Sequence, residues 1–134
     1  MERVVLERPF RPWHFSVGHG RLILHSYARA GEPESFSVLF GGVQAMQLHT
    51  ASYNPLIIDQ ADEAKRAEML AFAAIPERHQ ARMLSLTLPG RGAGAGWILC
   101  YFAGVYARPS DRTGVDMRAF DEARRVHLMR AARR

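Results

Sequence analysis

The sequence predicts an α+β fold, with a single domain over residues 1–134 and frayed termini. The domain is mostly an antiparallel sheet or partly open barrel of about six to seven strands. Its 134 residues match the usual size of one domain. Residues 35–58 and 92–107 contain no Asp, Glu, Lys or Arg and are rich in branched and aromatic side chains, as buried strands are. Charged residues gather instead in 59–82 and 111–134, where helical patterns occur.

The first predicted strand pair covers residues 13–17 and 21–27, joined by a two-residue turn at Gly18-His19. In an antiparallel pair with this turn, alternate residues point to opposite faces of the sheet. The face expected to meet the core carries four apolar side chains: Trp13, Phe15, Leu22 and Leu24. The other face carries His14 and His25, on a diagonal.

The remaining strands follow the same reasoning. A second pair covers 36–40 and 43–49, where Gly41-Gly42 supplies the positive φ of a tight hairpin turn. A short strand is expected at 56–59, after Asn54-Pro55. The last pair covers 83–88 and 97–107, around a glycine-rich stretch.

Two helices complete the predicted fold, one near residues 60–72 and a C-terminal one near 115–131. Asp59 is placed to cap the first helix, and Pro76 lies beyond its end. The second helix places Met117, Phe120 and Leu128 along one side. That stripe is expected to dock against the sheet.

The histidines His14 and His25 are the candidate metal ligands, because diagonal residues on neighbouring strands lie about 7–8 Å apart. A zinc site needs three or four ligands, and no cysteine pair or further histidine motif supplies the others. We therefore interpret both as polar-face residues of a hairpin and predict no metal and no cofactor.

The stretch "GRGAGAG", residues 90–96, has the loose form of a phosphate-binding loop. Such a loop must open a helix, whereas the residues that follow are typical of a strand. We expect a flexible hairpin loop here, and the sequence leaves open whether this loop becomes ordered on a partner. The single cysteine, Cys100, lies within that strand and is interpreted as a small buried hydrophobe.

The net charge is +5 and the pI is near 10.1, a balance that raises the question of nucleic acid. Seventeen of the 18 basic residues are arginine, which together with the many Ala and Gly residues is typical of a GC-rich genome. The excess charge is concentrated in the last eleven residues. The candidate partner-binding residues are Arg91, Arg124, Arg125 and Arg130.

The segments "PWHFSVGHGRLILHS", "SFSVLFGGVQAMQLHT" and "NPLIID" resemble the opening of a small uncharacterised protein family from GC-rich bacteria. The resemblance covers about residues 12–60 and implies no activity. Seven strands followed by a C-terminal helix are also similar to the layout of pleckstrin-homology-like domains. That similarity implies a binding module.

These observations predict a non-catalytic protein-binding module, of adaptor or immunity type. Two alternatives remain: a nucleic-acid-binding protein that uses the basic C-terminal helix, and a small-ligand binder or enzyme with a site near the histidine-bearing strands. The N-terminus has no long apolar segment of the signal-peptide kind, and no apolar run is long enough to span a membrane. We therefore expect a cytoplasmic protein without a membrane partner.

Overall fold

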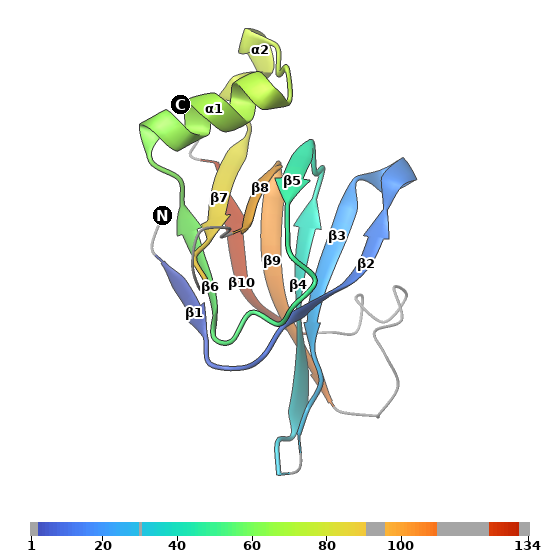
Figure 1. Ribbon diagram of the computed structural model, residues 1–134. Coiled ribbons are helices and arrows are strands. Elements are labelled where there is room, and N and C mark those ends of the chain that lie inside the picture. The colour runs from blue at the N-terminus through green and yellow to red at the C-terminus, as the bar shows by residue number, and fades with distance from the viewer. Residues whose placement is uncertain (1–2, 30, 91–95, 110–123, 132–134) are drawn as a thin grey trace.

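The computed structural model describes residues 3–29, 31–90, 96–109 and 124–131, which form two five-stranded antiparallel sheets (Figure 1). Sheet 1 has the strand order β1-β6-β7-β8-β5, and sheet 2 has the order β10-β9-β4-β3-β2. The strands of sheet 1 are β1 (Val4–Leu6), β5 (Ala45–Gln47), β6 (Leu56–Gln60), β7 (Leu84–Leu88) and β8 (Gly96–Cys100). Those of sheet 2 are β2 (Arg11–Ser16), β3 (Arg21–Ser26), β4 (Glu34–Gly41), β9 (Phe102–Pro109) and β10 (Arg124–Arg130).

A bent two-stranded ribbon joins the two sheets. One strand of the ribbon runs from β4 into β5 and the other from β8 into β9, and the two pair in both sheets. Strands that pass from one sheet to another bend at glycines or bulges. Here Gly42 has φ +64°, and a Cβ at this position would lie 2.3 Å from the Tyr101 ring. The expected hairpin at Gly41-Gly42 is therefore wrong, because these glycines turn the chain from one sheet into the other.

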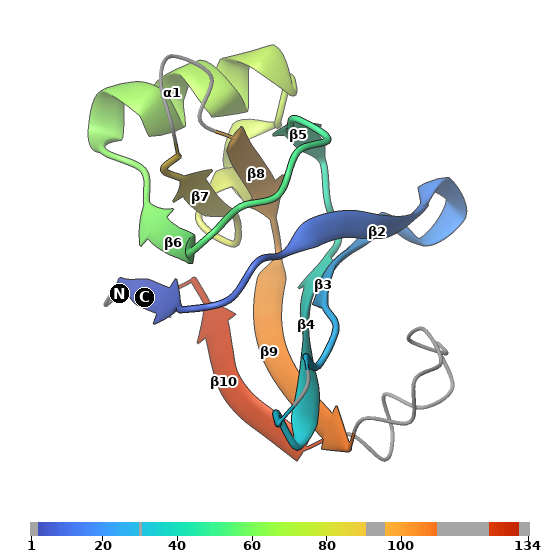
Figure 2. The ribbon, with the colours of Figure 1, turned by 60° about the horizontal axis from the view of Figure 1, so that its bottom comes forward.

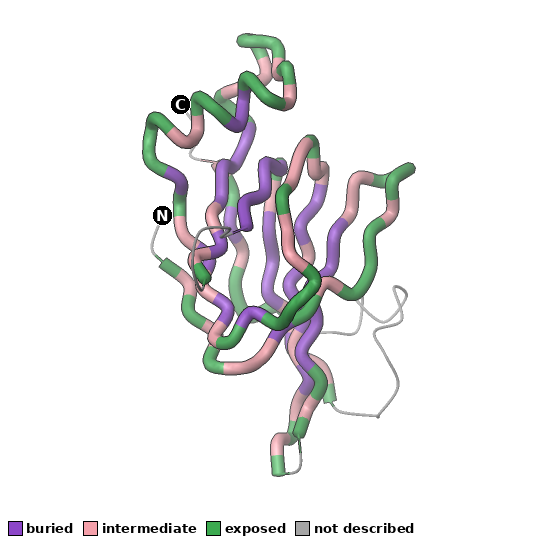
Figure 3. Tube along the Cα trace, in the orientation of Figure 1, coloured by how far each residue is buried: buried purple, intermediate pink, exposed green. Residues whose placement is uncertain are grey.

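The main core lies between the two sheets. Alternate residues of the central strands point inward, as the period of two in a strand requires. Its largest fully buried side chains include Phe10, Phe40, Leu22, Leu24, Leu56, Ile58, Leu86, Leu88 and Ile98. Buried positions follow these central strands through both sheets (Figure 3).

Two short helices accompany sheet 1. Helix α1 (Glu63–Phe72) lies against β8, where Met69 and Leu70 pack with Trp97 and Leu99 in a second buried cluster (Figure 1). Its cap is Asp62, whose side chain accepts a hydrogen bond from the Lys65 backbone N–H at 2.7 Å. The helix near 60–72 is confirmed, but the expected cap at Asp59 is wrong. Helix α2 (Glu77–Gln80) follows as a single turn.

The first hairpin differs from the predicted register. Phe15 pairs with Leu22 and His14 with Ile23 as expected, but a bulge then inserts Trp13, so that Pro12 pairs with Leu24. Leu22 and Leu24 are buried, whereas Trp13 and Phe15 are 37% and 39% exposed. The Trp13 ring lies 6.1 Å from the His25 ring, so both residues share one face. The expectation that Trp13 faces the core opposite His25 is wrong.

The C-terminal helix expected near 115–131 is also wrong where the chain is described. Residues 124–130 form the edge strand β10, which pairs antiparallel with β9. Residues 115–123, including Met117 and Phe120, lie outside the described residues. The predicted antiparallel sheet is confirmed, but the strands among the described residues number ten in two sheets rather than about six to seven.

Candidate functional site

The two candidate metal ligands differ in exposure. His14 is exposed on the edge strand β2, whereas His25 on β3 is only 4% exposed. The Trp13 ring contacts both, at ring-centre distances of 5.8 Å and 6.1 Å. Among the described residues no three His, Cys, Asp or Glu side chains lie close enough together to hold a metal ion.

His25 is a buried, neutral imidazole. Its Nδ1 lies 2.8 Å from the Ser37 hydroxyl, and the Tyr27 ring lies nearly perpendicular to the imidazole, at 4.4 Å between ring centres. Burial, followed by the positive charges of Arg108 and Arg8, lowers the pKa of His25 to about 4. Its Nε2 is buried without a hydrogen-bond partner among the residues that the structure describes. The His25 ring is thus enclosed by its neighbours.

The partner-binding candidates lie on β10, except for Arg91, which falls outside the described residues. Arg124 is already paired, because its guanidinium lies 2.9 Å from the Glu34 carboxylate. Arg125 and Arg130 are exposed, and no described carboxylate forms an ion pair with either.

A groove of about 770 Å³ runs beside the C-terminal half of β10, and we call it the β10 groove. Five consecutive residues of the β10 end of the chain, His127 to Ala131, line it. Consecutive residues of a strand point to opposite faces, so a cavity that touches all of them borders the edge of the strand. The opposite wall consists of Gln60, Arg66, Glu77, Gln80, Ala81, Met83, Leu84 and Ser85.

The topology explains why this groove exists. On the side of the ribbon away from β4 and β5, β7 pairs with β8 and β10 pairs with β9. The start of β7 and the end of β10 meet the ribbon on either side of Tyr101, since Leu84 pairs with Cys100 and Arg130 with Phe102. Figure 2 shows β10 beside β9 at the rim of sheet 2. The β10 groove is therefore the opening that remains where the two sheets separate.

Arg66 of α1 fixes the opposite wall. Its guanidinium donates to the carbonyl oxygens of Met83 at 2.9 Å and Gln80 at 2.6 Å, and to the Ser85 hydroxyl at 3.2 Å. These acceptors are neutral, and no described carboxylate pairs with Arg66. Its positive charge therefore stays available to the groove, in which Glu77 is the one acidic residue among the described lining.

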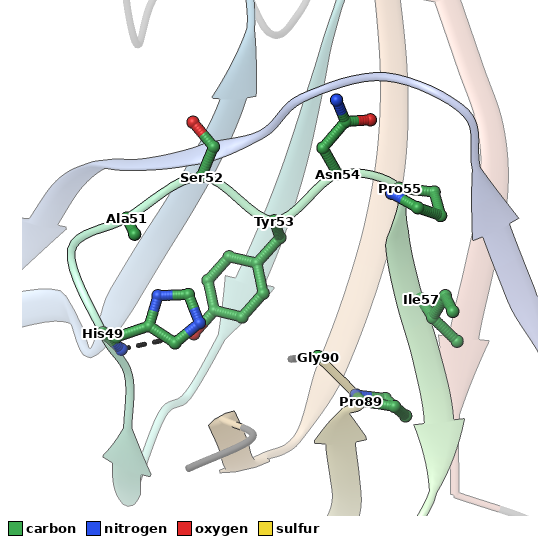
Figure 4. A pocket seen from close by; sticks show the side chains of 9 residues that line it. All are labelled: His49, Ala51, Ser52, Tyr53, Asn54, Pro55, Ile57, Pro89 and Gly90. Carbon is green, nitrogen blue, oxygen red and sulfur yellow. Dashed lines mark hydrogen bonds between the residues drawn. The ribbon is translucent and has the colours of Figure 1, made fainter. Parts of the chain in front are cut away.

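A second pocket, of about 710 Å³, lies at the opposite end of β6, and we call it the His49 pocket (Figure 4). The His49 ring stacks on Tyr53 at 4.1 Å between ring centres, and the Tyr53 hydroxyl accepts a hydrogen bond from the His49 backbone N–H at 3.3 Å. The facing walls come from Pro55, Ile57 and Pro89. His49 Nδ1 is buried and has no hydrogen-bond partner within the described part of the chain.

Cys100 matches its interpretation. It is fully buried on β8, and this burial raises the pKa of its thiol to about 12. A thiol that stays protonated at neutral pH is a poor nucleophile.

The sequence reasoning missed Arg66, the β10 groove and the His49 pocket. Arg66 stands at an ordinary helical position, and only the fold brings it opposite β10. The signal that was available is the aromatic and polar stretch from His49 to Asn54, which interrupts the apolar strands.

No protein-family model matches the chain, and the comparisons find neither a curated protein nor a solved structure that is similar to it. None of the helices in the described ranges is long and apolar enough to cross a membrane.

Proposed function

We propose that the chain is a non-catalytic protein-binding module that takes up an extended segment of its partner beside β10. The observation that carries this proposal is the β10 groove, which borders the edge of β10 that pairs with no described strand. An exposed sheet edge offers unpaired backbone N–H and C=O groups, and a partner segment can pair with them as an added strand. The groove then receives the side chains of that segment.

The lining of the β10 groove supports strand addition. Standing beside β10, a partner strand would lie about 5 Å from it. The wall formed by Arg66, Ala81 and Ser85 is then placed to contact the inward-pointing side chains of the partner. Affinity in this mode comes from main-chain hydrogen bonds, and specificity comes from alternate side chains.

The nucleic-acid alternative receives less support from the same groove. Proteins that bind single strands stack bases on aromatic side chains. None of the described residues that line the β10 groove is Phe, Tyr or Trp.

The experiment is a selection of displayed seven-residue peptides on the whole chain, followed by two-dimensional amide NMR with the best peptide. We expect shifts concentrated in Arg124–Arg130, with little change in the other long edge, Arg11–Ser16. The same peptide methylated on alternate backbone nitrogens is expected to lose binding, because it can no longer donate main-chain hydrogen bonds.

A matched pair of variants tests the groove itself. Ala81 is exposed and lines the groove, whereas Ala71 is exposed on α1 and does not. Ala81→Trp should weaken binding by about tenfold or more, since the indole occupies the groove, and Ala71→Trp should leave it unchanged. Peptides that shift only residues elsewhere, or that bind the Ala81→Trp variant as well as the original chain, would contradict the proposal.

The small-ligand alternative rests on the His49 pocket. A largely apolar cavity of this size with a few polar groups is the usual form of a small-molecule site. This alternative is tested by titrating indole, and separately phenol, into the same NMR sample. Shifts confined to residues 49–57 at micromolar probe would favour this alternative over the β10 groove.

A further inference from the structure

We infer that the partner segment is acidic and follows the alternating pattern acidic–x–apolar–x–acidic, where x is any residue. The inference rests on the proposed function, because it describes the occupant of the same strand edge. The register of β10 carries the alternating pattern, and the positive charge around its groove favours an acidic segment in general.

The register places three side chains of β10 on one face. Along β9, Phe102, Gly104 and Tyr106 alternate and so point to the same side of sheet 2. Their partners on β10 are Arg130, Leu128 and Arg125, with a bulge at Val126 that keeps this spacing. The core-facing positions of β9, Ala103 and Ala107, are buried, so the Arg–Leu–Arg row lies on the outer face.

An added strand would face this row residue by residue. Side chains opposite one another on neighbouring strands lie about 5 Å apart, within reach of an ion pair. A carboxylate opposite Arg125, an apolar side chain opposite Leu128 and a carboxylate opposite Arg130 complement the row. The pattern reads the same in both chain directions, so it holds for parallel and antiparallel addition.

The charged residues around the groove are mostly positive, with Glu77 as the one acidic residue of the described lining. Arg66 lines the groove, Arg78 lies in α2, which forms part of the groove wall, and Arg82 follows α2. No described carboxylate forms an ion pair with any of these three arginines. Complementary charge of this kind raises the rate of encounter and excludes like-charged partners.

The test uses three capped peptides, TETVTET, TQTVTQT and TKTVTKT, with fluorescence anisotropy for affinity and NMR for position. Two exposed ion pairs predict that TETVTET binds about tenfold more tightly than TQTVTQT at low salt, with TKTVTKT weakest. The double variant Arg125→Glu, Arg130→Glu should reverse this order. The control variant Arg11→Glu, Arg21→Glu, on β2 and β3 at the other side of sheet 2, changes the net charge equally and should keep the original order.

Each contrary outcome has a distinct meaning. Equal binding of TETVTET and TQTVTQT at β10 would overturn the acidic pattern and leave the proposed function standing. Display-selected peptides that bind β10 without acidic residues would do the same. Failure of display-selected peptides to bind β10 at all would overturn both. A thymidine oligonucleotide that binds β10 more tightly than TETVTET at physiological salt would replace the acidic peptide with nucleic acid as the partner.

Discussion

The two edges of sheet 2 differ in what they offer a partner. The edge strand β2 contains Pro12, which has no backbone N–H and so obstructs strand addition. Both edge strands carry a bulge, at Trp13 in β2 and at Val126 in β10. The connection from β2 to β3 is held against the ribbon by a hydrogen bond. The Gly20 carbonyl oxygen accepts it from the Val43 backbone N–H at 2.7 Å, and Gly20 itself has φ +57°. The other edge, β10, has no proline and borders the β10 groove.

The difference originates at the corner of the ribbon. On the side of β4 and β5, the β2–β3 connection covers the bend through Gly20 and Val43. On the side of β8 and β9, no described segment fills the space between β7 and β10, and the groove remains. One edge is therefore covered at the corner, and the other borders an open groove. The predictions below test this division, from the largest expected effect to the smallest.

The largest effect on stability is expected in the core at β3, the strand that pairs with β2. Leu24 is fully buried between the sheets, so Leu24→Ala should lower the free energy of unfolding by about 2–5 kcal/mol. Leu128 on β10 is only half-buried, and Leu128→Ala should cost less than about 1 kcal/mol. Urea denaturation of both variants measures the difference. Equal costs would mean that β10 is as much a part of the core as β3.

The second-largest loss of stability is expected at the bend of the ribbon, at Gly42. Gly42→Ala forces a Cβ against the Tyr101 ring at φ +64°, and it should destabilise the chain by about 3 kcal/mol. Gly18→Ala is the control, since its Cβ would meet nothing within 4 Å, and a change within about 0.5 kcal/mol is expected. Thermal melting distinguishes them. A Gly42→Ala variant as stable as the original chain would contradict the role of Gly42 in the bend.

Protonation of His25, on β3 next to the edge strand β2, is expected to make the stability of the chain depend on pH. Its pKa is lowered to about 4 in the folded chain, against 6.5 ordinarily, so the unfolded chain binds more protons between these values. The stability that the neutral ring contributes is complete above pH 6.5 and is lost as the pH falls towards 4. The loss should be roughly 2–3 kcal/mol by urea denaturation at several pH values.

The variant His25→Gln tests whether His25 causes this pH dependence of the free energy of unfolding, because Gln keeps a polar group near Ser37 but does not titrate. We expect a flatter profile between pH 6.5 and 4. The exposed His14→Gln is the matched control for the substitution on the neighbouring strand. A slope that survives in His25→Gln would assign the pH dependence to other groups.

The smallest effects are expected on β10. Arg124→Ala removes the exposed ion pair with Glu34 and should cost about 0.2–1 kcal/mol. Arg125→Glu with Arg130→Glu should change stability by less than about 0.5 kcal/mol, because no described carboxylate pairs with either arginine. Urea denaturation checks both. A large loss in the double variant would show that these arginines stabilise the fold, and would remove the reason to assign them to binding.

The antiparallel strands, the helix near 60–72 and the buried Cys100 were predictable from local pattern, because burial and helix formation leave a periodicity in the chain. The candidate site was predictable only in part. Arg125 and Arg130 were identified as partner-binding candidates from charge, but Arg66 and the His49 pocket arise from segments that are distant in sequence.

The sequence by itself determined which segments are apolar and alternate, and hence that an antiparallel sheet forms.

Only the tertiary structure decided three further points. Gly41-Gly42 suits a hairpin turn and a bend between sheets equally well, and pairing with β8 selects the bend. Trp13 shares a face with His25 because a single bulge shifts the register, and no local pattern marks a bulge. Residues 124–130 suit a helix by their spacing, yet they form a strand because β9 presents an unpaired edge. The backbone N–H and C=O groups along the edge of β9 need hydrogen-bond partners, and residues 124–130 supply them by forming a strand. This tertiary pairing outweighs the weak helix propensity of the segment.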